Sequence, residues 1–541
     1  MVDHDALSDG RAANAPDEVP PTREAVRPDR LDGLDADAAA RLVNAVGLLQ
    51  AQRLAEAERE LDAVLSVAPD HAEALRLKAL ARQLDGDTNG AVLLLRRAVQ
   101  RHPRDAPLLN NLGSALFAQR NARAALAAWR GACEADPGYA SAWFNQGCVL
   151  LRRTDFEAAE AALARAIEID PGHAEAHNAR ARALAALGRD AEAADAYRRA
   201  IAIDPARATA WAGLSDLPGH RFDDGQIAAL RAARQSSNPV ARERLALDLA
   251  LGRALEQRGE YQEAFTAIAA ANAARRALRP AWDRAKFSQH IDAIMRAFEE
   301  FPTPTDVPAL GERTIFLVGL ARADAAPAER VLCAHAKVAL VGESRDLAEV
   351  IREQSALSGK PFPEWAVETA PHDWERLGRI YLERLGEQGD AGDQSQPLFR
   401  VDSTISNWPL LGAVLTMLPA ARVIDCRREA LSACWDCHAD VFAPASGVWA
   451  CALDDLGAYW QDYDRLALFW RARYGSRIHT ARLEELVADP RRAARSLIAA
   501  CGLSPDPASV RAAAETRVSL RGSLDGYGAR LDSLRRSLGL K

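Results

Sequence analysis

The sequence predicts a multi-domain fold, in which an all-α solenoid of repeated helix pairs is followed by an α/β domain with a parallel sheet. One observation is a proline that recurs every 34 residues, at Pro69, Pro103, Pro137, Pro171 and Pro205. This period is the length of a helix-turn-helix repeat. The other is that, from about Gly311, short apolar runs alternate with helix-like stretches, which is typical of a parallel sheet covered by helices.

The first 35 residues are polar, acidic and proline-rich. They lack the apolar core of a secretory signal, and no later run reaches membrane-spanning length. We therefore expect residues 1–35 to be disordered, the protein to be cytoplasmic, and no membrane to be a partner.

Composition excludes several classes of protein. The 541 residues carry a net charge of −7 with basic residues dispersed among acids, so no electrostatic footprint for nucleic acid is present. Eight cysteines in a chain of this length do not make a disulfide framework, and reduced thiols are expected.

Each 34-residue period shows the spacing of one helical face. Ala159, Leu163 and Ala166 stand at i, i+4 and i+7, and equivalent residues recur in the neighbouring periods. Aspartates precede three of the prolines, which predicts a helix N-cap followed by a proline in the first turn, at Asp136, Asp170 and Asp204.

One repeat carries a full set of motif residues, at Trp143, Gly147, Ala159, Leu163, Ala166 and Pro171. Residues 36–215 therefore resemble the tetratricopeptide-repeat family, with about five repeats. A further unit with Gly252, Ala264 and Ala271 at the same offsets follows a break near Pro218. We predict a tetratricopeptide-repeat domain over 36–276 and a linker over 277–310.

Asn111 and Asn145 lie one period apart on the first helix of successive repeats. This helix is expected to line the concave surface, and a side-chain amide donates and accepts hydrogen bonds at once. The two asparagines are thus candidate peptide-binding residues for a protein or peptide in the groove. The alternative is that they contact neighbouring helices or solvent.

The second half contains five apolar runs that are too short and irregular for helices, at 315–320, 338–341, 398–401, 422–426 and 477–481. We interpret them as the strands of a domain over 311–541. Ligands of such domains bind at the carboxyl ends of the strands.

The motifs after these strands resemble the sulfotransferases found in bacteria behind tetratricopeptide arrays. The order of motifs carries the resemblance: GESRDL at 342–347 is similar to the family's G-E-L-R-D-L, CRRE at 426–429 to C-R-R-D-P, and RLEELVADP at 482–490 to R-Y-E-D-L-V-A-D-P. The resemblance implies a P-loop-type enzyme that transfers a sulfuryl group from 3′-phosphoadenosine 5′-phosphosulfate (PAPS) to a hydroxyl group.

Site residues follow from the same resemblance. Glu343 takes the place of the general base, and the alternative for it is an N-cap or surface carboxylate beside Arg345. The residues assigned to the cofactor are Arg322, Arg427, Arg428 and Ser523. Arg428 corresponds to the arginine that binds the 3′-phosphate.

Several residues depart from the family's pattern. The phosphate loop G-M-P-R-S-G-T-T-L corresponds to GLARADAAP at 319–327, so Asp324 replaces a glycine and alanines replace the hydroxyl side chains. Asp436 replaces the serine that would join Arg428 at the 3′-phosphate, and Ser403 replaces a lysine that stabilises the transferring sulfate. A carboxylate repels a phosphate, and the lost donors add to that cost.

We therefore predict a tetratricopeptide-repeat protein with a degenerate PAPS-binding loop, which acts as a protein-binding pseudoenzyme without a certain cofactor. The alternative is an active sulfotransferase that uses PAPS to modify a hydroxyl of a peptide or carbohydrate. A third possibility is a scaffold in which neither domain binds nucleotide.

Cys434, Cys437 and His438 match the C-x-x-C-H pattern of covalent haem attachment. Such attachment needs export, which the N-terminus does not support. A zinc site is disfavoured because no second closely spaced pair completes four ligands. We interpret the segment as a helix with two buried thiols and expect no metal.

Overall fold

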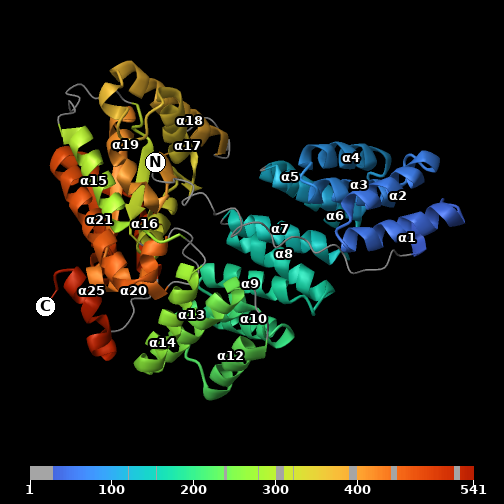
Figure 1. Ribbon diagram of the computed structural model, residues 1–541, viewed down its shortest axis with the longest axis horizontal. Helices are drawn as coiled ribbons and strands as arrows, with labels where there is room; N and C mark the ends of the chain where they lie inside the picture. Colours follow the sequence, from blue (N-terminus) through green and yellow to red (C-terminus); the bar gives the residue numbers. More distant parts are fainter. Residues whose placement is uncertain are drawn as a thin grey trace. The chain divides into compact units, whose positions relative to one another are not determined.

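The computed structural model describes residues 28–540, except 120, 154, 237–240, 278–279, 300–309, 321, 389–398, 440–446 and 517–523. The chain divides into two compact units between helices α12 and α13. Figure 1 traces both units along the chain.

The first unit is a run of helix pairs that follows the 34-residue period. It opens with a single 3-10 turn, η2 (Pro28–Leu31). Ten regular helices follow: α1 (Ala36–Gln50), α2 (Leu54–Val67), α3 (Ala72–Leu84), α4 (Thr88–Arg101), α5 (Ala106–Ala118), α6 (Ala122–Ala135), α7 (Ala140–Arg152), α8 (Phe156–Ile169), α9 (Ala174–Ala186) and α10 (Asp190–Ile203). The unit ends with α11 (Ala208–Asp216) and α12 (Asp224–Ser236).

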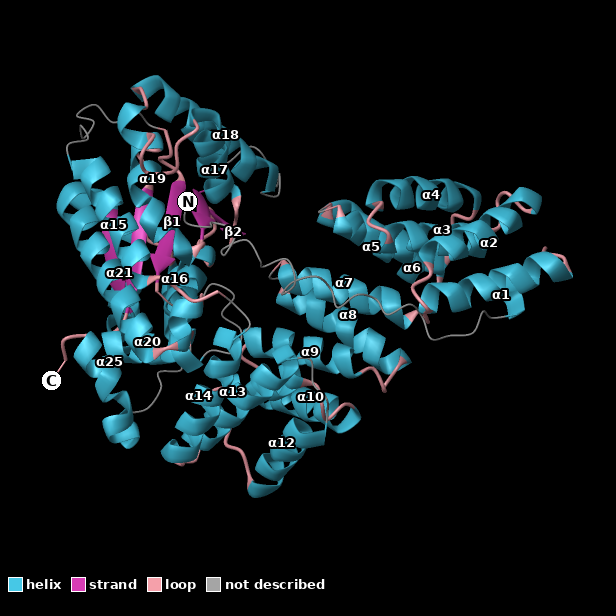
Figure 2. Ribbon diagram, viewed as in Figure 1, coloured by secondary structure: helices cyan, strands magenta, loops and turns pink. Residues whose placement is uncertain are grey.

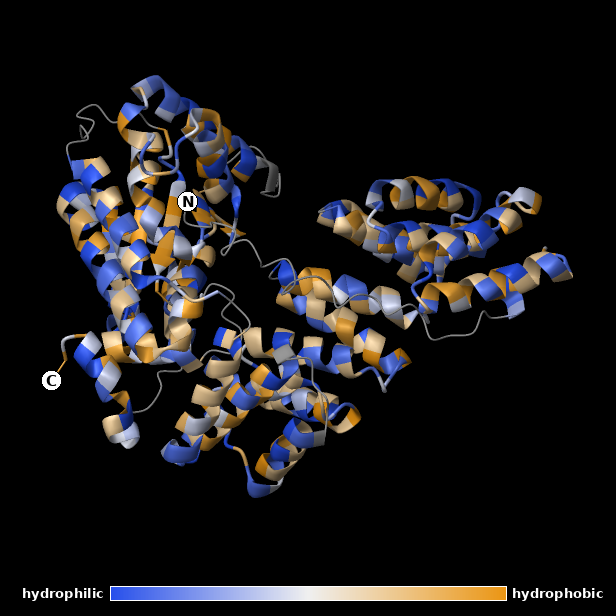
Figure 3. Cartoon of the chain, in the orientation of Figure 1, coloured by the Kyte–Doolittle hydropathy of each residue, from blue (hydrophilic) through white to orange (hydrophobic). Residues whose placement is uncertain are grey.

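The periodic small residues allow the helices of a pair to lie close together. Ala159 and the alanines that stand at the equivalent position of the other periods are fully buried, namely Ala57, Ala91, Ala125 and Ala193. A Cβ added to Gly113 would lie 2.6 Å from Nε1 of Trp129 on the paired helix. The helices carry hydrophobic and hydrophilic residues on different sides (Figure 3), as amphipathic helices do.

The predicted N-caps before the prolines are wrong. Asp136 ends α6, and its carboxylate accepts a hydrogen bond from the amide of Gly138 at 2.9 Å. Asp170 and Asp204 end α8 and α10 in the same way. Each Asp-Pro pair therefore forms the turn between repeats, because an aspartate side chain can hold a turn by bonding to the amide two residues on.

The second unit is built on a sheet of five parallel strands in the order β2-β3-β1-β4-β5. Figure 2 draws the strands in magenta among the cyan helices. The strands are β1 (Thr314–Gly319), β2 (Val338–Gly342), β3 (Phe399–Asp402), β4 (Arg422–Arg427) and β5 (Ile478–Arg482). All five strands expected from the sequence are confirmed, with ends that differ by one residue at most.

Helices cover both faces of the sheet. Alternate residues of β1 face different cores: Phe316 and Val318 pack in one, and Ile315 and Leu317 in the other. The surrounding helices are α16 (Arg322–Cys333), α17 (Asp346–Ser358), α18 (Pro371–Gln388), α19 (Leu411–Met417), α20 (Ala430–Ala439), α21 (Leu453–Tyr474), α22 (Leu483–Ala488), α23 (Pro490–Ala500), α24 (Pro507–Glu515) and α25 (Asp532–Ser537). Short 3-10 turns join them, namely η3 (Ala366–Glu368), η4 (Ile405–Leu410), η5 (Val448–Cys451), η6 (Gly475–Arg477) and η7 (Leu524–Leu531).

Three helices precede the sheet within the second unit: α13 (Ala241–Gln257), α14 (Tyr261–Ala277) and α15 (Arg284–Glu299). The pair α13–α14 is repeat-like, because a Cβ at Gly252 would lie 2.5 Å from Ile268, as one at Gly147 would from Leu163. Nevertheless it packs with the α/β domain. Asn272 of α14 is fully buried, and its Nδ2 donates to the carbonyl of His438 at 2.7 Å.

The boundaries of the two units differ from the domain limits expected from the sequence. The expected repeat domain ran to residue 276, whereas the division between units lies before α13. The expected linker, 277–310, contains α15, whose Ile291, Ile294 and Phe298 are buried in the core of the second unit. Within the expected disordered segment, residues 1–27 lie outside the described part, and η2 is folded against the repeats. Of the described helices, none is both long and apolar enough to span a bilayer.

Candidate functional site

The site lies where β1 and β4 end beside each other. Gly319, the last residue of β1, is paired with Cys426 of β4. A Cβ at Gly319 would lie 2.8 Å from the carbonyl oxygen of Cys426, so only glycine allows the strands to end this closely. As a result, the first turn of α16 and the residues after β4 meet at the carboxyl edge of the sheet.

A buried arginine lies between two aspartates at this edge. Nε of Arg428 is 2.9 Å from Oδ1 of Asp324, with the two side chains 2% and 1% exposed. On its other side, a terminal nitrogen of Arg428 donates to Oδ2 of Asp436, on α20. Asp324, Arg428 and Asp436, here called the buried arginine triad, therefore join α16, the end of β4 and α20.

With both carboxylates ionised, the buried arginine triad carries one more negative than positive charge. Glu484 also acts on Asp324 electrostatically, and its own Oε1 accepts from the amide of Glu429 at 2.7 Å. Burial raises the pKa of Asp324 to about 7, although Arg428 opposes that shift. Oδ1 of Asp324 and Nε of Arg428 are close but poorly aligned for a hydrogen bond, so their attraction is mainly electrostatic.

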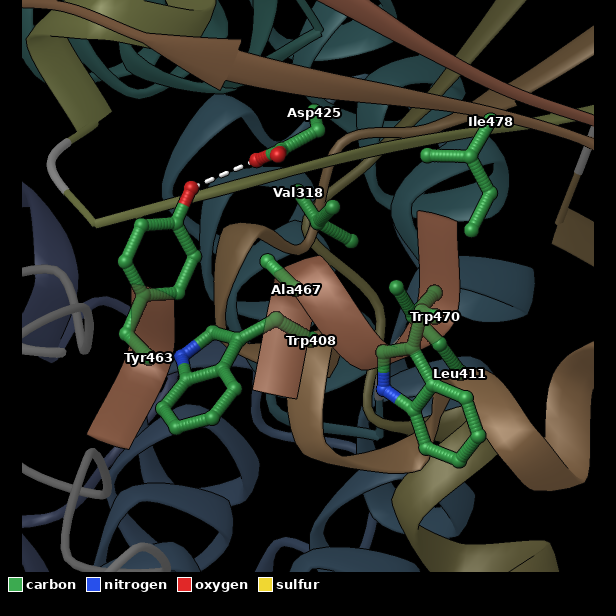
Figure 4. Close-up of a pocket in the computed structure, with 8 residues that line it drawn as sticks. All are labelled: Val318, Trp408, Leu411, Asp425, Tyr463, Ala467, Trp470 and Ile478. Carbon is green, nitrogen blue, oxygen red and sulfur yellow. Dashed lines mark hydrogen bonds between the residues drawn. The ribbon is translucent and has the colours of Figure 1, made fainter. Parts of the chain in front are cut away.

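Arg427 points to a different set of partners. Its Nε donates to Asp425 at 2.7 Å, and it also pairs with Asp464. Its guanidinium lies 4.8 Å from the ring centre of Tyr463, whose hydroxyl donates to Asp425. Figure 4 shows this Tyr463–Asp425 bond beside a cavity of about 10 Å³, which is room for one water and far too small for a nucleotide.

Comparison with known proteins agrees with this architecture. The model of the sulfotransferase family matches residues 314–507. The tetratricopeptide-repeat model matches four overlapping stretches, 42–106, 85–140, 110–172 and 144–208. The chain carries tetratricopeptide repeats followed by a sulfotransferase family domain.

The individual relatives are distant. An uncharacterized protein of Aquifex aeolicus is 25% identical over 304 residues, which are 53% of this chain and 38% of the relative. This chain therefore spans less than half the length of that relative. Solved structures match part of the chain. The structure of PilF from Pseudomonas aeruginosa is 21% identical, covers 43% of this chain and 97% of its own, and has a TM-score of 0.33. A thermophilic tetratricopeptide-repeat protein of Thermus thermophilus is 25% identical, covers 31% and 92%, and has a TM-score of 0.28.

In the sulfotransferase family domain, the residues after β2 and β3 form a second polar group. Glu343 follows β2 and is exposed. Ser403 follows β3, is fully buried, and its Oγ has no hydrogen-bond partner among the described residues. Beside it, the carboxylate of Asp402 accepts from the hydroxyl of Tyr381 at 2.6 Å and from the amide of Thr404 at 2.9 Å. Burial raises the pKa of Asp402, against these two hydrogen bonds.

The remaining predicted cofactor residues lie partly outside the description. Arg322 begins α16, but its side chain is not among those described. Ser523 lies outside the described residues. Downstream of it, a Cβ at Gly526 would lie 2.1 Å from the ring of Tyr261 on α14. The C-terminal segment of the domain is therefore packed against the repeat-like pair.

The C-x-x-C-H segment is a helix with two buried thiols, as predicted. Cys434 and Cys437 lie on α20 and are 0% and 4% exposed. Nδ1 of His438 lies 2.8 Å from the carbonyl of Ala450. Among the described residues, no group of His, Cys, Asp and Glu has the arrangement of a metal site.

The two asparagines of the repeat unit differ in their surroundings. Asn145 is 7% exposed, and its Nδ2 donates to Oδ1 of Asn110 at 2.9 Å, from α7 to α5. This amide holds neighbouring helices together and does not offer that donor to a peptide. Asn111 is half-buried and keeps its place as a candidate.

Two features of the domain were missed in the sequence. The aspartates at 324 and 436 were interpreted only as groups that repel phosphate, whereas the structure makes both of them partners of Arg428. The role of Glu256 was also missed: its Oε1 accepts from Trp435 at 3.0 Å and from Tyr527 at 2.8 Å. The pairing of the two aspartates with Arg428 had a usable signal in the sequence, because the charge changes at two positions around one arginine. No local pattern in the sequence marks the role of Glu256.

Proposed function

We propose that the chain is a protein-binding tetratricopeptide-repeat protein whose sulfotransferase domain is a pseudoenzyme that does not bind PAPS. The buried arginine triad is the observation that carries this proposal. Arg428, which the family resemblance assigns to the 3′-phosphate, already has two carboxyl groups of the chain as partners.

A phosphate that approached Arg428 would have to displace or lie beside two carboxylates. Two unit charges about 4 Å apart interact by roughly 4 kcal/mol at an effective dielectric constant of 20, and like charges repel by that amount. Displacing Asp324 would also leave a buried carboxyl without its counter-ion, which is costly. Both terms oppose nucleotide binding.

The residues expected to act on the sulfate support the same conclusion. At the position of the family's lysine, the short and uncharged Ser403 is fully buried, so it brings no positive charge to a developing anion. Glu343 keeps an exposed carboxylate, but a general base alone supplies only part of a catalytic site. In this proposal the domain has a structural role, because α13 and α14 pack on it.

The decisive experiment is a calorimetric titration with 3′-phosphoadenosine 5′-phosphate, the product nucleotide, which needs no acceptor. We expect no heat from the wild-type chain at millimolar nucleotide. The double variant Asp324→Gly with Asp436→Ser frees Arg428 and should gain measurable binding. Asp292→Ser is the matched control, because it removes a carboxylate from Arg465, which the resemblance does not assign to the cofactor, and it should not gain binding.

Micromolar binding by the wild-type chain would overturn the proposal and favour an active enzyme. That enzyme would transfer labelled sulfate from PAPS to a peptide or carbohydrate hydroxyl, and Glu343→Ala would abolish the transfer. If neither the wild type nor the double variant binds, the domain acts as a scaffold only.

The proposed partner is a polypeptide that lies along the repeats. Asn111 is the remaining amide candidate for its backbone. Asn111→Ala should weaken capture of the partner, whereas Ser114→Ala, on the same helix with its hydroxyl bonded to the carbonyl of Asn110 at 3.2 Å, should not. Unchanged capture by Asn111→Ala would remove that residue from the interface.

A further inference from the structure

An arginine from outside the helix pairs lies between two carboxylates of different repeats. Nε of Arg30, in η2, donates to Oε2 of Glu73 at 2.9 Å. One terminal nitrogen donates to Oδ2 of Asp105 at 2.5 Å, and the other reaches Oδ1 at 3.4 Å. Glu73 is in the first turn of α3, and Asp105 is the N-cap of α5.

The repeat period shows that this cation replaces one that a later repeat supplies by itself. Glu175 and Arg207 stand three periods after Glu73 and Asp105, at the equivalent positions. There, the glutamate and the arginine pair directly with each other across the repeats. At the first position both residues are acidic, and the guanidinium that lies between them is that of Arg30.

The charges at this site balance only with Arg30 in place. Glu73 also pairs with Arg76, three residues on, at 2.5 Å. Burial would raise the pKa of Glu73, but Arg76 and Arg30 together lower it to about 2. Among the described residues, Arg30 is the cation that pairs with Asp105. Without Arg30, Glu73, Asp105 and Arg76 together carry one excess negative charge, and the two carboxylates are open to solvent on the side that Arg30 covered.

The segment that carries Arg30 is held by few contacts. No residue of η2 is buried, and Pro28 and Asp29 are exposed. Leu31 and Leu34 are only partly buried against the core of the first repeats. A different segment with an arginine could therefore take this place without opening the hydrophobic core.

We propose that Glu73 and Asp105 form a receptor site for an arginine of a partner polypeptide, and that Arg30 fills this site in cis until the partner displaces it. Arginine fits better than lysine because its planar fork reaches both carboxylates at once. The inference rests on the protein-binding role proposed for the repeats and gives the chemistry of the partner.

The test is fluorescence anisotropy with the full chain and a labelled peptide that copies residues 26–34, VRPDRLDGL. The chain with Arg30→Ala should bind this peptide at least tenfold more tightly than the wild type, in which Arg30 competes. A second peptide with alanine at the position of Arg30 keeps the arginine at position 27 and should not bind. Adding Asp105→Asn to the Arg30→Ala chain should abolish binding, since asparagine still caps α5 but brings no charge.

Controls separate this effect from a general change of charge or of folding. Arg41→Ala removes an exposed arginine that pairs with Asp37 and Glu60, and it should leave peptide affinity at the wild-type level. Arg30→Lys keeps the charge and a folded first repeat, and should give an affinity between those of the wild type and Arg30→Ala.

Equal affinity of the wild type, Arg30→Ala and Arg30→Lys would overturn the inference, as would equal binding of the two peptides. Because the titration contains no nucleotide, such a failure would leave the pseudoenzyme proposal standing. A gain of nucleotide binding in the other experiment would likewise leave this site untouched.

Discussion

Oδ1 of Asp324 lies 2.9 Å from Nε of Arg428, and both side chains are almost wholly excluded from solvent. The contact joins the first turn of α16 to the residue that follows β4. Asp436 completes it from α20. One arginine thus holds together three segments at the carboxyl edge of the sheet. The buried arginine triad therefore has a structural role whether or not it excludes a nucleotide.

Replacing Arg428 by methionine should destabilise the second unit strongly. The change leaves the buried carboxyl group of Asp324 and the partly buried one of Asp436 without a counter-ion, and breaking a buried ion pair in this way costs about 3–5 kcal/mol. Urea unfolding of the full chain at pH 8, followed by tryptophan fluorescence, measures the loss. The triple variant that also carries Asp324→Asn and Asp436→Asn should recover most of it, and an equal loss in both variants would contradict the account.

Asp324→Asn should change how stability depends on pH. The pKa of Asp324 is raised to about 7 in the folded state, against roughly 3.9 in an unfolded chain. The folded state therefore binds more protons between these values, and this contribution to stability is complete below pH 4 and lost as the pH rises through 7. Asparagine is neutral at every pH, so the stability of the Asp324→Asn variant does not fall in this way as the pH rises.

The difference in unfolding free energy between Asp324→Asn and the wild type should therefore grow in favour of the variant from pH 5 to pH 8. Within this range the contribution is lost between pH 5 and about pH 7, so the difference should grow by at most roughly 3 kcal/mol. Denaturant titrations at several pH values give the difference directly. A difference that stays constant from pH 5 to pH 8 would show that Asp324 is ionised throughout.

Two glycines in one helix pair should respond in opposite ways to alanine. A Cβ at Gly113 would lie 2.6 Å from the ring of Trp129, which is 3% exposed and cannot move freely. Gly113→Ala should cost about 1–3 kcal/mol through overpacking. At Gly131 on α6 the nearest atoms would lie at 3.8 Å, so Gly131→Ala should stabilise the helix by up to about 1 kcal/mol. Thermal melts of both variants test the contrast.

The fold was predictable where a pattern repeats or where strands are short and apolar. The 34-residue period indicated the helix pairs, and the buried alanines at 57, 91, 125, 159 and 193 confirm the face that it predicted. The turn chemistry was harder to infer. Asp136 and its equivalents bond to the amide two residues on and end the preceding helix, because aspartate before proline suits a turn as well as a cap.

The candidate site was predictable as a set of substitutions but not as a set of contacts. Asp324 and Asp436 were visible as charge changes, yet their joint partner depends on how β1, β4 and α20 meet in space. The helices α13 and α14 present the same difficulty, since their internal spacing is that of a repeat while Glu256 and Asn272 bond to residues some 170 to 270 positions away. Local sequence does not record such distant pairing.

The packing of α13 and α14 gives a prediction about truncated chains. A chain of residues 238–541 keeps the bonds from Glu256 to Trp435 and Tyr527 and the buried amide of Asn272. A chain of residues 277–541 loses them and exposes Trp435 and Tyr527, which are now fully buried. We expect the longer chain to unfold in one cooperative transition and the shorter one to aggregate or to bind the hydrophobic dye ANS. Equal stability of the two chains would place α13 and α14 with the repeats instead.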